Sequence, residues 1–188
     1  YLERMLEILS GFDGDSHVVL GNHDLHVVAR GIGAVPEWPR ETFRDLFDAP
    51  DADTLIDWLR HRPLVHHEGD WFMVHAGLHP SWSLDNAKEI AREVEDAIQT
   101  DRAMDLLRTY RRGPTCWSDK LKGDDRLAAA IAYLTRVRCV DDQDALEPDY
   151  SGDLEGVPDG RRPWWEGRPE TAGRIVFGHW AAIGVFDG

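Results

Sequence analysis

The spacing of apolar residues predicts an alternation of helices and short strands. In the first ten residues, leucine and methionine recur at intervals of three and four, which is typical of one face of a helix. The apolar run "HVVL" follows and predicts a short buried strand that ends at a glycine. A helix, a strand and then a polar loop is the order expected of an α/β protein, whose sites usually lie at the carboxyl ends of the strands.

Similar patterns predict the elements that follow. A short helix is expected after Thr42 and a longer one after Pro50, because threonine can cap a helix and proline suits its first turn. Residues 64–67 and 71–74 predict two strands joined by the turn "EGD", and Ser83 can cap a long helix. Another helix is expected around Leu127, Ile131 and Leu134, and "RIVF" predicts a final strand. Residues 141–173 are acidic and rich in glycine and proline, which predicts a long loop.

Composition indicates a globular chain of one domain, residues 1–188, with 42% hydrophobic and 30% charged residues. There are 35 acidic and 21 basic residues, so the formal net charge is −14. This balance argues against nucleic acid or an anionic membrane as a partner. An anionic substrate would have to be held by metal ions or by a few arginines.

The two cysteines could pair, but they indicate no disulfide framework, and a reducing, cytoplasmic compartment is expected.

Three strand-like runs end in the same way, as "VVLGNHD", "WFMVHAG" and "IVFGHWA". Each places a histidine beside or close to a glycine after an apolar run. Because neighbouring strand ends converge in space, we expect Asn22, His75 and His179 to ligate one divalent cation. One amide oxygen and two imidazole nitrogens suit Mn, Fe, Co or Zn. His23 would then be left beside the metal as a general acid.

Each of these residues also has an ordinary structural explanation. Asn22 alone is typical of a turn, His75 could be a core histidine bonded to backbone, and His179 could simply pack on its neighbouring tryptophan. His26 and His79 are expected near the site without ligating. The remaining histidines are expected to be surface or strand residues, namely His17, His61, His66 and His67.

The blocks "GNHD", "VHAG" and "FGHWA" resemble the later signature motifs of the calcineurin-like metallophosphoesterase superfamily. Within it, "LGNHDLHVVARGIG", "APDADTLIDWLRHRPLV", "VHAGLHPSWSLDNAKEIAREVE", "LTRVRC" and "RPWW" resemble the symmetrical diadenosine tetraphosphatases over nearly the whole chain. The resemblance implies a β-sandwich flanked by helices in α/β/β/α layers, incomplete in this chain. It also implies two divalent metal ions, with Mn or Co expected and Fe or Zn as alternatives. The substrate would be a dinucleoside polyphosphate, cleaved at its central anhydride into two ADP by in-line attack of hydroxide.

Carried onto this sequence, the resemblance implies metal ligation by Asn22, His75 and His179, and protonation of the leaving group by His23. Asp24 would either brace this loop or cap the helix that follows, and the sequence leaves both open.

Substrate contacts are less clearly marked in the sequence. Arg136 and Arg138 in "TRVR" are candidates for binding phosphate oxygens, and alternation puts both on one side if this segment is a strand, although ordinary surface arginines would give the same pattern. Several tryptophans could stack on adenine, but they are equally typical of core anchors. The candidates are Trp82, Trp117, Trp164 and Trp165.

The chain departs from the superfamily pattern in one large respect. The opening blocks "GDxHG" and "GDxxDRG" are absent, and the chain begins at Tyr1. We therefore expect a sequence truncated at both ends and inactive by itself. Two alternatives stay open: another metallophosphoesterase, such as a phosphoprotein phosphatase, or a non-catalytic metal-binding module.

Overall fold

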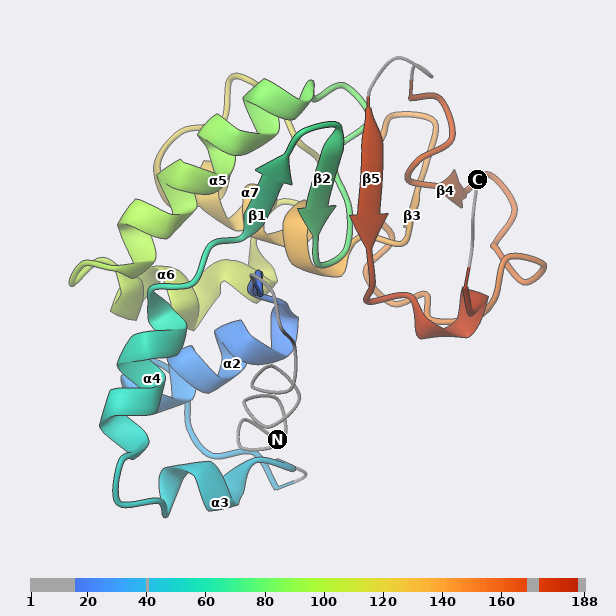
Figure 1. Ribbon diagram of the computed structural model, residues 1–188. Helices are drawn as coiled ribbons and strands as arrows, with labels where there is room; N and C mark the ends of the chain where they lie inside the picture. The colour runs from blue at the N-terminus through green and yellow to red at the C-terminus, as the bar shows by residue number, and fades with distance from the viewer. Residues whose placement is uncertain (1–15, 40, 169–172, 186–188) are drawn as a thin grey trace.

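The computed structural model describes residues 16–39, 41–168 and 173–185 (Figure 1). The helix expected in the first ten residues lies outside these ranges. None of the helices in the described ranges has the length and apolar character needed to span a membrane. Helices and strands together confirm the α/β class.

Within the described residues the predicted helices are present, together with α6 (Ala103–Thr109), which was not predicted. The helices are α2 (Asn22–Gly31), α3 (Arg44–Phe47), α4 (Ala52–Arg60), α5 (Leu84–Ile98), α6 (Ala103–Thr109) and α7 (Gly123–Arg136), with short 3₁₀ turns η1 (Tyr110–Arg112) and η3 (Ala181–Ile183). Ser83 caps α5 as expected, because its hydroxyl accepts the backbone N–H of Asn86 at 3.1 Å. The expected cap at Thr42 is wrong, since α3 starts after Phe43 without a side-chain cap.

A three-stranded sheet positions the ends of its strands for the site. It contains β1 (Val65–Glu68), β2 (Trp71–Val74) and β5 (Arg174–Phe177), in the order β1-β2-β5. β1 and β2 form the expected antiparallel hairpin, with Gly69 at φ +57° in the turn. β2 and β5 are parallel, and Val74 lies opposite Phe177. A second sheet pairs β3 (Cys139–Val140) with β4 (Arg162–Pro163), so the expected loop at 141–173 contains a short strand.

The core lies on one face of the three-stranded sheet. Figure 1 shows α5 beside β1 and α7 behind the hairpin. Phe72 and Val74 are fully buried in the same cluster as the inner sides of these helices, including Val94 and Ile131. On the opposite face, the Trp71 side chain is 51% exposed. The structure therefore shows a helix-covered sheet, and the layered sandwich remains a prediction.

The strand predicted at "HVVL" is not formed. Residues 16–20 have no regular secondary structure, and Leu20 donates a backbone hydrogen bond to the Pro63 carbonyl at 2.8 Å. Pro63 has no N–H to return to this segment, and the N–H of Leu64 donates to the Glu95 carboxylate at 2.7 Å. Within the described residues, this segment therefore forms no ladder with its neighbour.

The "TRVR" segment does not form the strand that would place both arginines on one side. Helix α7 extends through Arg136, and Arg138 immediately precedes β3. The apolar residues of α7 continue the helical pattern up to Leu134, which is fully buried, so helix packing overrides the local alternation. The two cysteines are both free, with Cys116 exposed and Cys139 buried.

Candidate metal centre

The parallel pairing of β2 and β5 brings two histidines together. His75 directly follows β2, and His179 follows β5 after one glycine. The N–H of Gly178 donates to the His75 carbonyl at 2.9 Å, which ties the two strand ends to each other. As a result, His75 Nε2 and His179 Nδ1 lie 3.2 Å apart.

Asn22 reaches the same point from the first turn of α2. Its Oδ1 lies 3.0 Å from His75 Nε2. Gly21, just before the helix, allows this approach, because a Cβ at that position would lie 2.5 Å from two atoms of the His75 ring. The polar residues that the sequence placed in a loop therefore begin a helix. The structure brings together Asn22, His75 and His179, the three residues predicted to share a cation.

The electrostatics of the trio suit a cation. Burial lowers the pKa of His75 to about 4 and that of His179 to about 3, and the charge of Arg138 contributes to both shifts. Both imidazoles are therefore neutral at neutral pH and keep a lone pair for a metal. One amide oxygen and one imidazole nitrogen, each within hydrogen-bond distance of His75 Nε2, fit together with it a single borderline divalent ion.

His23 and Asp24 differ in their exposure and in their contacts. The His23 side chain is exposed beside the trio, in the same turn of α2. Asp24 instead folds back, and its Oδ2 accepts the backbone N–H of Gly21 at 2.7 Å. Burial raises the pKa of the Asp24 carboxyl, while the hydrogen bond from Gly21 opposes that rise. Asp24 thus secures the start of α2, and with it the position of Asn22.

The two candidate arginines are placed differently from each other. Arg138 donates from Nη1 to the Tyr150 carbonyl at 3.1 Å and from Nη2 to the His179 carbonyl at 3.5 Å. It therefore supports the backbone that carries His179. Arg136 is half-buried at the end of α7, where burial and the neighbouring charge of Arg111 lower its pKa.

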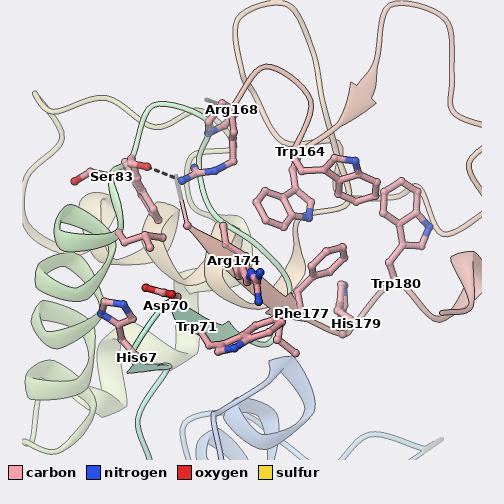
Figure 2. A pocket seen from close by; sticks show the side chains of 18 of the residues that line it. His67, Asp70, Trp71, Ser83, Trp164, Arg168, Arg174, Phe177, His179 and Trp180 are labelled. Carbon is pink, nitrogen blue, oxygen red and sulfur yellow. Dashed lines mark hydrogen bonds between the residues drawn. The ribbon is translucent and has the colours of Figure 1, made fainter. Parts of the chain in front are cut away.

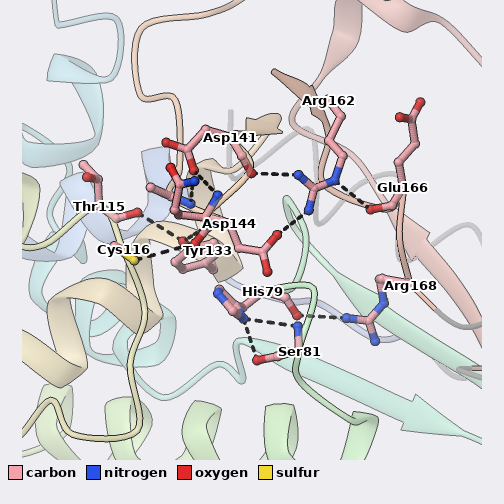
Figure 3. Close-up of polar contacts among 12 residues, drawn as sticks. His79, Ser81, Thr115, Cys116, Tyr133, Asp141, Asp144, Arg162, Glu166 and Arg168 are labelled. Carbon is pink, nitrogen blue, oxygen red and sulfur yellow. Dashed lines mark hydrogen bonds and ion pairs between the residues drawn. The ribbon is translucent and has the colours of Figure 1, made fainter. Parts of the chain in front are cut away.

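His79 belongs to a separate packing cluster, shown in Figure 3. Its Nδ1 lies 2.8 Å from Ser81 Oγ, and its carbonyl accepts a hydrogen bond from Arg168 at 3.0 Å. The ring packs against Tyr133 in an edge contact at 4.9 Å. His26, one helical turn after Asn22 in α2, has its Nε2 3.6 Å from the Glu41 carboxylate. Neither histidine joins the trio.

The tryptophans considered for base stacking are mostly core anchors. Figure 2 shows Trp164, Phe177 and Trp180 grouped beside His179 along an open pocket. The Trp164 side chain is 1% exposed and packs edge-on against Phe177 at 5.2 Å. Trp82 and Trp117 are likewise buried and in edge contact with each other at 4.8 Å. These side chains offer no free ring face for an adenine.

Sequence reasoning did not assign roles to the glycines or to the supporting contacts. Gly21 makes room for the His75 ring, Gly178 links the two strand ends, and Arg138 supports His179. The available signal was the glycine that stands next to the functional residue in "GNHD" and "FGHW".

Gly21→Ala is expected to lower metal binding without unfolding the chain. The added methyl would meet the His75 ring at 2.5 Å, so the ring must move away from Asn22 and His179. The metal affinity should fall at least 10-fold, which calorimetric titration with Mn²⁺ would measure. Gly33→Ala is the matched control, because nothing lies within 4 Å of a Cβ there and any effect should be on stability alone. Equal affinities in Gly21→Ala and the unchanged protein would contradict the close packing described here.

Comparison with known proteins identifies clear relatives of this chain. It is 41% identical over 173 residues to a protein of Nitrosomonas europaea named "Bis(5'-nucleosyl)-tetraphosphatase, symmetrical", a match that covers 89% of this chain and 64% of that protein. Proteins with the same name from Burkholderia mallei and Burkholderia pseudomallei are 44% identical over 170 residues, covering 89% of this chain and 60% of each of them. No family profile matches the chain. The chain thus spans about three fifths of the length of these curated relatives.

Proposed function

We propose that the protein carrying this chain is a symmetrical bis(5'-nucleosyl)-tetraphosphatase of the metallophosphoesterase type. It would hydrolyse diadenosine tetraphosphate at the central anhydride and release two ADP. The observation that carries the proposal is the convergence of Asn22, His75 and His179 within 3.0–3.2 Å, reached from three separate elements. The named relatives, at 41–44% identity, support the same reaction and substrate.

The trio would hold one of two divalent ions, with manganese or cobalt favoured. When bound, the ions supply an activated hydroxide and neutralise charge on the transferring phosphoryl group. The chain's own contribution is to fix the ligands. Asp24 secures the helix start that carries Asn22, and Arg138 secures the backbone that carries His179. The residues described here account for one ion, and the ligands of the second are left unassigned.

His23 would supply the proton that the departing nucleotide needs. Its exposed ring stands one residue after the ligand Asn22, so it can reach a leaving oxygen on a phosphoryl group held at the centre. Arg136 is the arginine proposed to bind phosphate oxygens, since its half-buried guanidinium lies near that of Arg111. Arg138 would contribute its positive charge from the position in which it already donates a hydrogen bond to the His179 carbonyl.

The products of the reaction test the proposal directly. The protein that carries this chain should convert diadenosine tetraphosphate into ADP alone, whereas asymmetric cleavage would give ATP and AMP. Chromatography of the products distinguishes the two. A phosphopeptide and p-nitrophenyl phosphate serve as competing substrates, and a higher kcat/KM for the phosphopeptide would favour a phosphoprotein phosphatase. Metal binding without turnover of any of the three would indicate a non-catalytic module.

A further inference from the structure

A second group of metal-ligating side chains lies away from the metal centre, at the edge of the three-stranded sheet. It consists of His17, His66 and Glu68. His66 and Glu68 belong to β1 and project from the face opposite the core, whereas His17 precedes α2. Of the described residues, these three place one possible ligand atom each within 4.8 Å of one another.

The distances within this group leave room for an ion but not for hydrogen bonds. His17 Nε2 and His66 Nε2 each lie 3.5 Å from the same oxygen, Glu68 Oε2. Tetrahedral ligands at zinc–nitrogen and zinc–oxygen distances stand about 3.4 Å apart, which matches these separations. Among the described residues, the buried His66 Nε2 has no hydrogen-bond partner, and it lies 3.5 Å from Glu68 Oε2.

The two rings are stacked, with centroids 3.6 Å apart and planes 17° from parallel. Parallel rings cannot both aim a lone pair at one ion, so binding requires one ring to turn. His17 is the ring able to do so, because its side chain is 40% exposed and lies outside any helix or strand. Rotation about its side-chain bonds would turn the Nε2 lone pair toward an ion beside Glu68 Oε2 without moving β1.

We propose that His17, His66 and Glu68 form a second, peripheral cation site for Zn²⁺ or a similar borderline ion that prefers imidazole with carboxylate. Two imidazoles and one carboxylate leave the fourth position to water. The bound ion would join residues 16–20 to β1. This segment contacts the neighbouring part of the chain through the backbone bond from Leu20 to Pro63 and the buried Leu20 side chain, and it leads directly to Asn22. The ion would therefore cross-link residues 16–20 to β1 and stabilise the segment that leads to the metal centre.

Zinc titration in a background without the metal centre tests the site. The protein that carries this chain would be prepared with Asn22→Ala and His75→Ala, so that zinc bound at the trio does not obscure the result. Adding His66→Ala should lower the zinc stoichiometry of this background by one ion per chain. His67→Ala is the matched control, because His67 is the neighbouring β1 residue on the other face, beside Phe72. It should leave the stoichiometry unchanged.

Glu68→Gln provides a variant that cannot unfold the sheet, since the Glu68 side chain is 75% exposed. It should weaken zinc binding at least 10-fold in the same background. Zinc should also raise the melting temperature of the background protein and not that of the His66→Ala variant. Unchanged zinc affinity in Glu68→Gln, or an equal loss in His67→Ala, would overturn the proposal and show adventitious binding to surface histidines.

Discussion

Asn22→Ala and His75→Ala are each expected to abolish metal binding at the centre and hydrolysis of diadenosine tetraphosphate together. Each substitution removes one of three ligand atoms that converge within 3.0–3.2 Å. Changes in residues that only support a ligand cost 10–100-fold, so loss of a ligand itself should lower kcat/KM by more than about 100-fold. Manganese content and turnover would be measured in parallel on the protein that carries this chain.

His61→Ala is the control for this experiment. His61 is an exposed histidine whose Nδ1 lies 2.7 Å from the Asp57 carbonyl in α4, away from the trio. Its removal should change neither metal content nor turnover. Full manganese content in either ligand variant would exclude Asn22 or His75 as a ligand. Retained metal with lost activity would move that residue from ligation to positioning of the substrate.

The position of the site could be predicted because it follows from a topological rule. Runs of apolar residues before His75 and His179 predict strands, and the structure pairs these strands in parallel with Val74 opposite Phe177. Parallel neighbours necessarily bring their carboxyl ends to the same edge. Once that pairing exists, the two histidines must meet. The cap at Ser83 was predictable from local sequence, because its side-chain oxygen can accept a helix N–H.

The features that the sequence did not predict depend on distant partners. Residues 16–20 have the composition of a strand. The segment beside them, however, contains Pro63, which has no N–H, and the N–H of Leu64 donates to Glu95 of α5. The "TRVR" segment alternates like a strand, yet burial of α7 continues the helix through Arg136. In both cases tertiary packing overrides a local preference. The layered sandwich is a property of sheets still further apart, and the described residues do not test it.

His23→Asn is expected to leave the metal bound and to lower turnover of diadenosine tetraphosphate by about 10²–10⁴, the usual contribution of general acid–base catalysis. The expected separation of metal binding from turnover follows from geometry. The Asn22 side chain faces His75 at 3.0 Å, whereas the His23 side chain is exposed one residue later on the same helix turn. Asparagine keeps a polar side chain of similar reach but cannot donate an imidazolium proton. Manganese content and kcat would be measured on the same preparations.

The leaving group decides whether His23 acts as the acid. Unsubstituted phenolate is a strongly basic leaving group that needs a proton, whereas p-nitrophenolate leaves readily without one. If His23 supplies that proton, the loss in His23→Asn should be large for phenyl phosphate and small for p-nitrophenyl phosphate. Equal losses on the two substrates would instead assign His23 to positioning the phosphoryl group, because positioning benefits both reactions alike. The ratio of the two losses therefore measures how much of the contribution of His23 is proton transfer.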